Sequence, residues 1–210
     1  RGLIIDGPDP YNSSWLASES WRELLIEHFH YSDDEIIYLS ARNDRDYVDD
    51  DSTKENIVEA IQNLSETLST GDNLSVFIAM HAGNINGVPG NGQFALRRAE
   101  TLQDKELAQL LSQIEEGVHI TVVIDSCFSG SFIDDLCKIP QVEIIVTATD
   151  WKSMAHHASS GLDPPDGCYE FVVNMTADPN KEDEGGEFSS GLIEGLEKLA
   201  PAFNIGEIAL

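Results

Sequence analysis

The sequence contains few basic residues. Its 210 residues include 12 Lys and Arg against 38 Asp and Glu, which gives a formal net charge of −26 at pH 7. Nucleic acids and anionic membranes bind proteins through basic faces that replace their counterions, so this excess of acid argues against both as partners. Cations and basic peptides are the partners that such a surface attracts.

Cysteine is also scarce, and long apolar runs are missing. The three cysteines, Cys127, Cys137 and Cys168, allow one disulfide at most and form no CxxC pair, which argues against a disulfide scaffold and a zinc ribbon. No apolar run approaches the roughly 18 residues of a membrane span. The chain opens on Arg1 with neither Met nor a signal peptide. We therefore expect a piece of a longer chain, and its start indicates no compartment.

A folded core is nevertheless expected. The hydrophobic fraction of 41% is too high for a disordered acidic chain, and a domain of this length buries about 70% of its extended surface. We find no internal repeat and no interdomain linker. The sequence therefore predicts one domain over 1–210, and it does not indicate an oligomeric state.

Short apolar runs alternate with longer amphipathic stretches. The runs typical of strands are 3–5, 35–39, 74–79, 120–124 and 142–147. Apolar residues recur at helical spacing over 15–29, 57–68, 107–114 and 192–199. This alternation is typical of a mainly parallel sheet with helices on its faces. We therefore predict an α/β fold, a three-layer α/β/α sandwich around a mainly parallel central sheet.

Three regions interrupt the alternation. The stretch 83–92 is rich in glycine and precedes the strand-like 93–96, which predicts a glycine-rich hairpin. The stretches 44–51 and 178–187 are acidic. We expect them to be loops that lead into helices, where negative charge suits the positive end of the helix dipole.

The strongest functional signal follows the strand 120–124. This apolar run leads through Asp125 into Cys127 and then into small, turn-prone residues, so Cys127 is expected at the carboxyl edge of the sheet, where α/β proteins build their sites. The strand 74–79 likewise leads into His81. If the two strands are neighbours, His81 can be the base or cationic partner that a nucleophilic thiol needs. A buried structural cysteine and an ordinary loop histidine are the alternatives.

Together these features resemble the caspase-haemoglobinase fold of cysteine peptidases, the clan of legumain, metacaspases, clostripain and gingipain. The resemblance rests on a strand ending in His-Ala-Gly at 81–83, a hairpin and a helix, and a second strand ending in Asp-Ser-Cys-Phe-Ser-Gly at 125–130. It extends to the helical stretches 15–29 and 56–68 before the histidine and to 146–150 and 188–196 after it. It therefore covers nearly the whole chain. The resemblance to legumain-like and prokaryotic members is stronger than the resemblance to animal caspases. It implies a single caspase-like peptidase domain.

The resemblance implies a cysteine endopeptidase that cleaves peptides or proteins through a thioester acyl-enzyme. In that family role, Cys127 is the nucleophile and His81 is the general acid and base. The backbone amide of Gly83 or of Ala82 would form an oxyanion hole together with the amide of Cys127.

Three acids are candidates for substrate binding. Asp125 matches a position that lines the specificity pocket of legumain and metacaspases, and a carboxylate there would favour Arg or Lys, or else Asn, before the scissile bond. Asp150, after the next strand, is a candidate second wall of that pocket. Asp6, after the first strand, is a third candidate, with a turn residue as the alternative reading.

The histidine motif departs from the family pattern. The family usually has Gly-His-Gly, whereas this chain has Met80-His81-Ala82. Alanine presents its N–H but lacks the access of glycine to positive φ. The alternative function is therefore a catalytically inactive caspase-like module that binds a basic partner through its acidic surface.

The expected reaction requires no cofactor. Some metacaspases and clostripain relatives need calcium, and Asp178, Asn180 and Glu182 loosely follow a calcium-loop pattern. A solvated acidic loop is the alternative. A peptidase specific for basic residues could also cut itself, either at the Arg-Arg pair 97–98 or at Lys181.

Overall fold

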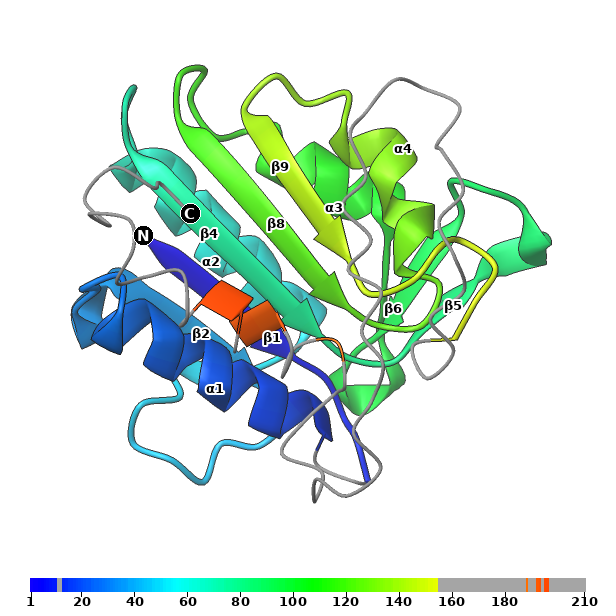
Figure 1. Cartoon of the computed structure of the whole chain (residues 1–210), viewed down its shortest axis with the longest axis horizontal. Coiled ribbons are helices and arrows are strands. Elements are labelled where there is room, and N and C mark those ends of the chain that lie inside the picture. The colour runs from blue at the N-terminus through cyan, green and yellow to red at the C-terminus, as the bar shows by residue number, and fades with distance from the viewer. Residues whose placement is uncertain (11–12, 155–187, 189–191, 194, 197–210) are drawn as a thin grey trace.

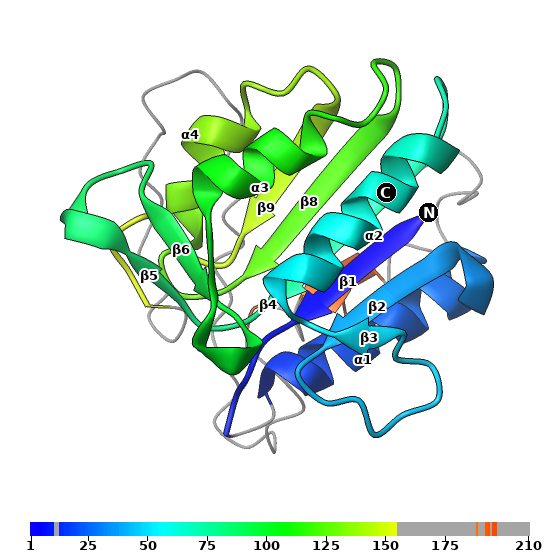
Figure 2. The same ribbon diagram turned by 180° about the vertical axis from the view of Figure 1, so that it is seen from behind.

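The computed structural model describes residues 1–10 and 13–154, together with Phe188, Leu192, Ile193, Gly195 and Leu196. Its centre is a sheet of parallel strands in the order β3-β2-β1-β4-β8-β9 (Figures 1 and 2). The strands are β1 (Gly2–Asp6), β2 (Ile36–Ser40), β3 (Asp50–Asp51), β4 (Asn73–Ala79), β8 (His119–Asp125) and β9 (Val142–Thr147).

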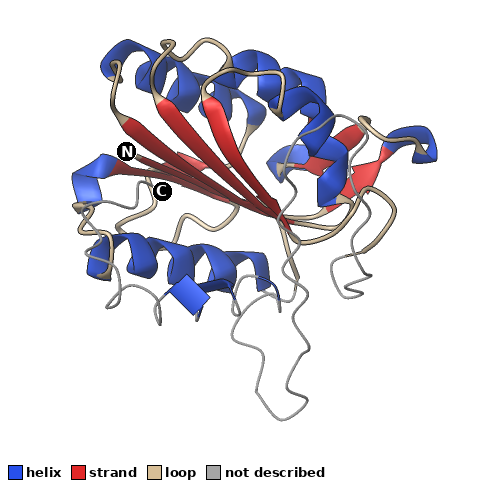
Figure 3. Ribbon diagram, turned by 45° about the horizontal axis from the view of Figure 1, so that its top comes forward, coloured by secondary structure: helices blue, strands red, loops and turns tan. Residues whose placement is uncertain are grey.

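Helices cover both faces of this sheet. The helix α1 (Ser13–Glu27) lies on one face, and α2 (Lys54–Thr67), α3 (Asp104–Leu111) and α4 (Ile133–Leu136) lie on the other (Figures 2 and 3). Short 3-10 turns, Asp33–Glu35, Ile85–Gly87, Arg97–Ala99 and Ser129–Phe132, join the remaining segments. The predicted three-layer α/β/α sandwich with its mainly parallel sheet is confirmed.

A second, antiparallel sheet lies beyond the carboxyl ends of the central strands (Figures 1 and 3). It has the order β5-β6-β7 and consists of β5 (Ala82–Asn84), β6 (Gly92–Ala95) and β7 (Thr101–Gln103). The predicted glycine-rich hairpin is therefore present as β5 and β6, and β7 adds a third strand. Phe94 of β6 stacks on Phe132, with ring centroids 4.0 Å apart, which packs the small sheet against the segment after β8.

The core divides into two clusters because strand residues alternate between the faces of a sheet. Ile4 packs toward α1, where Trp21 stacks on Phe77 at 4.8 Å between ring centroids. Leu3 and Ile5 pack toward the opposite helices. All of these side chains are fully buried, so β1 is covered on both faces, as its continuous apolar run predicts.

Some boundaries differ from the sequence prediction. The acidic stretch 44–51 ends in the two-residue strand β3, which extends the sheet by pairing with Leu39 and Ser40. The predicted loop 178–187 lies outside the described residues, as does half of the predicted helix 192–199. The extent of the domain over 1–210 stays a prediction. In the part of the chain that the structure describes, no helix has the length and apolar character needed to cross a membrane.

Candidate active site

Three neighbouring strands end at the same level of the central sheet. In the parallel register, Asp6 of β1 pairs with Ala79 of β4, and Ala79 pairs with Asp125 of β8. The site predicted from the sequence is therefore built on adjacent strand ends, at the carboxyl edge where open α/β sheets place their sites.

His81 and Cys127 each follow this level by two residues. The Met80 N–H donates to the Asp125 carbonyl at 3.3 Å, which continues the pairing of β4 and β8 past the regular strands. The imidazole of His81 is 58% exposed, and Cys127 is half-buried. The role predicted for His81 required the strands that precede His81 and Cys127 to be neighbours, and β4 does pair with β8. The catalytic roles of the two side chains stay predictions.

The segment after Cys127 adopts a constrained backbone. Phe128 has φ 56° and ψ 24°, which lies in the left-handed region, and its N–H donates to the Ser153 carbonyl at 2.8 Å. A non-glycine residue in this region costs of order 1–3 kcal/mol and is typical of functional sites. Gly130 is required nearby, because a Cβ there would lie 2.8 Å from the backbone of Asp150 and Trp151.

The backbone amides near His81 differ in direction. The His81 carbonyl accepts a hydrogen bond from the Ala95 N–H of β6 at 2.9 Å. Four residues later, the Ile85 N–H donates across the same pair of strands to the Asn91 carbonyl. Bonded and non-bonded pairs alternate in an antiparallel ladder, so the N–H of Gly83 is directed toward β6 and that of Ala82 away from it. Neither residue has a positive φ. Alanine at position 82 therefore needs no strained backbone.

Asp6 is fully buried, and both of its carboxylate oxygens accept hydrogen bonds. Tyr38 donates to Oδ2 at 2.9 Å, Ser40 donates to both oxygens, and the Ala41 N–H donates to Oδ1 at 2.8 Å. Burial raises the pKa of Asp6 to about 6, and the hydrogen bonds and Arg42 oppose this rise. Asp6 thus ties the end of β1 to the loop after β2.

Asp9 is a functional candidate that the sequence reading missed. Its carboxylate is 3% exposed, and Oδ1 lies 3.9 Å from Nε2 of His81. A cavity of about 280 Å³ opens beside it, lined by Asp6, Gly7, Pro8, Asp9, Trp15, Ala41, Arg42 and Arg97. The sequence signal that could have identified Asp9 is an acidic residue shortly before the start of a helix. Such residues accept hydrogen bonds from the first turn, and the Ser14 N–H donates to Asp9 at 3.0 Å.

The other two predicted pocket acids lie at different depths. Asp125 is half-buried at the end of β8, two residues before Cys127. Asp150 is buried in the loop after β9, and its Oδ1 accepts a hydrogen bond from the Lys152 N–H at 2.8 Å. The backbone of Asp150 packs on Gly130, behind the segment that carries the thiol. Their substrate contacts stay predictions.

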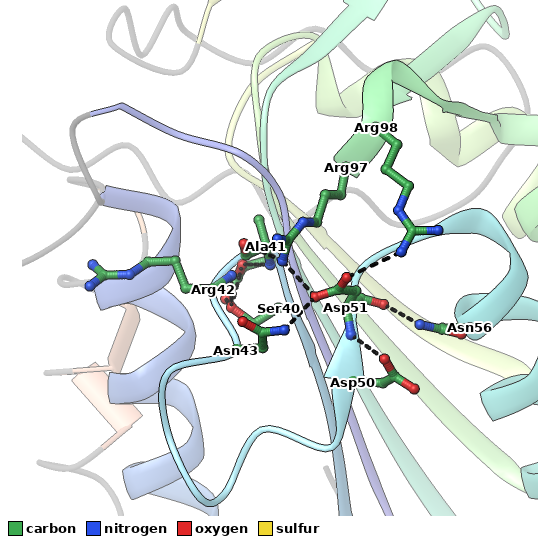
Figure 4. A network of polar contacts seen from close by, with 10 residues as sticks. Ser40, Ala41, Arg42, Asn43, Asp50, Asp51, Asn56, Arg97 and Arg98 are labelled. Carbon is green, nitrogen blue, oxygen red and sulfur yellow. Dashed lines mark hydrogen bonds and ion pairs between the residues drawn. The ribbon is translucent and has the colours of Figure 1, made fainter.

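A polar network joins the 3-10 turn Arg97–Ala99, which follows β6, to the loop after β2 and to β3 (Figure 4). Arg97 Nη1 donates to Asp51 Oδ1 at 2.5 Å and to the Ala41 carbonyl at 2.9 Å. Arg98 pairs with the other Asp51 oxygen at 3.5 Å, and Asn56 donates to the Asp51 carbonyl at 2.8 Å. The dibasic pair named as a self-cleavage site is thus engaged with Asp51, and self-processing stays a prediction.

The candidate calcium residues Asp178, Asn180 and Glu182 lie outside the described residues, as does Lys181. Among the residues that are described, no group of three or more His, Cys, Asp or Glu side chains is arranged to hold a metal ion.

The sequence is similar to those of known metacaspases. A family model described as the metacaspase, peptidase C14 domain matches residues 12–136. Metacaspase-1B of Neurospora crassa is 25% identical over 148 residues, which are 66% of this chain and 33% of the relative. Metacaspase-7 of Arabidopsis thaliana is 27% identical over 118 residues, 53% of this chain and 28% of the relative. The chain spans about a third of the length of these curated relatives.

Two solved structures are also similar. A protein from Geobacter sulfurreducens aligns with 60% of this chain and 50% of its own, at 20% identity and a TM-score of 0.45. A secreted C11 cysteine protease from Bacteroides thetaiotaomicron, solved with an irreversible peptide inhibitor, aligns with 66% of this chain and 46% of its own, at 18% identity and a TM-score of 0.37.

Proposed function

Since the chain belongs to the metacaspase, peptidase C14, family, we propose that it is a cysteine endopeptidase acting through Cys127 and His81. The observation that carries this proposal is the register of β4 and β8, because Ala79 pairs with Asp125 and both candidate residues follow that pair by two positions. A thiol and an imidazole at adjacent strand ends are the parts that covalent peptide hydrolysis needs.

In the proposed reaction, Cys127 transfers its thiol proton to His81 and its Sγ attacks the carbonyl carbon of the scissile bond. The developing oxyanion accepts hydrogen bonds from the backbone N–H groups of Cys127 and Ala82. We favour Ala82 over Gly83 because the Gly83 N–H is directed into the β5-β6 ladder.

The tetrahedral intermediate then collapses. The bond between the carbonyl carbon and the nitrogen breaks, and His81 gives its proton to the leaving amine, which leaves a thioester on Cys127. His81 next removes a proton from water, the hydroxide attacks the thioester, and the acid product leaves as the proton returns to the thiolate.

We propose a preference for Arg or Lys, or else Asn, before the scissile bond. Two acids support it: Asp125, two residues before the nucleophile, and Asp9, which lies 3.9 Å from His81 and lines the cavity of about 280 Å³. The two guanidinium groups at that cavity already have acidic partners, since Arg42 pairs with Asp44 and Arg97 pairs with Asp51. The carboxylate of Asp9 lines the same cavity and adds negative charge there, which favours a basic side chain.

The test uses Cys127→Ala and His81→Ala beside wild type, with fluorogenic peptides that carry Arg, Asn or Asp before the cut. We expect wild type to cleave the Arg peptide fastest and both variants to lose detectable activity. Cys137→Ala is the matched control, because Cys137 is also half-buried but lies at the end of α4. Its activity should equal that of wild type.

Calcium is tested in the same assay by adding the ion or a chelator. Calcium dependence would appear as activity that the chelator removes and calcium restores. The inactive binding module predicts a different outcome, in which wild type cleaves no peptide and Cys127 reacts with iodoacetamide at pH 6 no faster than Cys137 does. That outcome would refute the peptidase proposal.

A further inference from the structure

The loop that leaves β1 packs directly against the residue before His81. The Gly7 N–H donates to the Ala79 carbonyl at 3.1 Å, and a Cβ at Gly7 would lie 2.5 Å from the Cβ of Met80. Because glycine has no Cβ, the two backbones can approach this closely. Asp9, two residues further on, is thereby held beside His81.

Asp9 is itself anchored at the start of α1. Its Oδ2 accepts hydrogen bonds from the Ser14 N–H at 3.0 Å and from the Ser13 hydroxyl, as in a helix N-cap. Its Oδ1 is the oxygen that lies 3.9 Å from Nε2 of His81. One buried carboxylate thus joins the first turn of α1 to the imidazole of the candidate base.

The imidazole needs such a partner if it is to keep one orientation. It is 58% exposed, so solvent leaves it room to turn. Other ionisable groups at this edge include Asp6 at the end of β1, and Asp125 and Cys127 from β8 and the segment that follows it. Arg42 and Arg97 line the cavity beside Asp9. A carboxylate facing Nε2 favours the tautomer with its proton on Nε2, which leaves Nδ1 free to take the thiol proton.

We propose that Asp9 is a positioning residue for His81, an inference that rests on the proposed peptidase function. Asp9 holds Nε2–H, Nδ1 receives the proton of Cys127, and the carboxylate stabilises the imidazolium that results. The distance of 3.9 Å is that of an ion pair rather than of a hydrogen bond. Catalytic contacts of this kind tighten when the substrate binds.

A second role for Asp9 must be separated from this one. Because Asp9 also lines the cavity, it contributes to the proposed attraction of a basic side chain. A pocket wall affects only substrates with a basic residue before the cut, and it acts mainly on KM. A positioning residue affects kcat for every substrate, and it also affects the reaction of the thiol with a small uncharged reagent.

The experiment compares Asp9→Asn with wild type. Asparagine keeps an oxygen for the Ser14 N–H but removes the charge. We expect kcat to fall on the order of 10²-fold, the cost of a misplaced catalytic group, for an Arg peptide and for a Gln peptide alike. Alkylation of Cys127 by iodoacetamide at pH 6, followed by mass spectrometry of the labelled peptide, should slow about 10-fold or more.

Two further variants exclude indirect effects. Asp33→Asn makes the same chemical change at an exposed acid that pairs with Arg22, and it should leave all rates unchanged. Ser13→Ala weakens the contact at the start of α1 but keeps the Asp9 carboxylate. If Ser13→Ala reproduces the loss in alkylation rate, the effect of Asp9→Asn comes from the helix start, and the proposal is wrong. If Asp9→Asn fails to fold, Asp9→Glu replaces it and should retain the alkylation rate better than Asp9→Ala.

The outcomes also separate the two proposals. A wild type that cleaves no peptide overturns the peptidase function, and the role of Asp9 with it. A wild type that cleaves peptides beside an Asp9→Asn variant with unchanged alkylation, and with a loss confined to the Arg peptide, overturns only the positioning role.

Discussion

The two loops that carry the candidate site are held in place by different forces. Both depend on a glycine at a close approach, Gly7 after β1 and Gly130 after β8. The side-chain hydrogen bonds of the first loop end on carboxylates, those of Asp6 and Asp9. Such contacts depend on ionisation.

The loop after β8 is held by neutral groups. Thr149 and Ser129 exchange hydrogen bonds, with the Ser129 N–H donating to the Thr149 hydroxyl at 3.2 Å and the Thr149 N–H donating to the Ser129 hydroxyl at 2.9 Å. Both residues are buried. The difference suggests a division in which the base is placed by charge and the nucleophile by packing and neutral hydrogen bonds.

The largest effect on activity is expected for Gly130→Ala. The new Cβ would meet the backbone of Asp150 and Trp151 at 2.8 Å, so the loop that carries Cys127 must move. Cleavage should fall more than about 100-fold, and the free energy of unfolding should drop by about 1–3 kcal/mol. Peptide cleavage and urea unfolding measure the two effects.

The control for stability is Gly83→Ala, where a Cβ meets nothing within 4 Å and φ is not positive. Its free energy of unfolding should stay within about 0.5 kcal/mol of wild type. Equal stability losses in the two variants would contradict the claim that packing holds the nucleophile loop.

The second prediction concerns Asp6→Asn and pH. Burial raises the pKa of Asp6 to about 6 in the folded chain, against about 3.9 in an unfolded one. The folded state therefore holds a proton that the unfolded chain releases. Its stabilising contribution is fully present below about pH 4 and is lost as pH rises through about 6, by about 3 kcal/mol in all.

Asparagine cannot titrate, so this loss should be missing in the variant. Urea unfolding at several pH values from 4 to 7 should show the wild type losing its advantage over Asp6→Asn as pH rises. Asp33→Asn, at an exposed site, should not change the pH dependence. Parallel curves for wild type and Asp6→Asn would show that charge at this loop does not control its stability.

The smallest effect is expected for Thr149→Val. The substitution keeps the shape of the side chain but removes the hydroxyl that accepts from the Ser129 N–H. An unpaired buried donor costs about 1–2 kcal/mol. This loss should be the same at pH 4 and pH 7, because no ionisable group takes part. A loss that changes with pH would break the contrast between the two loops.

Much of the fold could be predicted because the positions of the apolar runs give the positions of the central strands. The run at 120–124 lies within β8 and the run at 74–79 lies within β4, since residues covered on both faces must be apolar. The strand β3 was not predicted, because Asp50 and Asp51 have no strand-like pattern and join the sheet only by pairing with β2.

The site could be predicted in part. His81 and Cys127 stood out because each follows an apolar strand, but their proximity depended on strand order. Asp9 was missed because its contact with His81 crosses from one loop to another, far along the chain. The choice between Ala82 and Gly83 likewise required the register of β5 with β6.

By itself, the sequence determined the alternation of strands and helices and the residue types at the strand ends, since these follow from local periodicity and composition. It also determined the strong acidic excess. Only the tertiary structure decided that β4 lies beside β8, that Gly7 brings Asp9 against His81, and that burial changes the titration of Asp6. These properties arise from contacts between segments distant in the chain, where packing and the loss of water act.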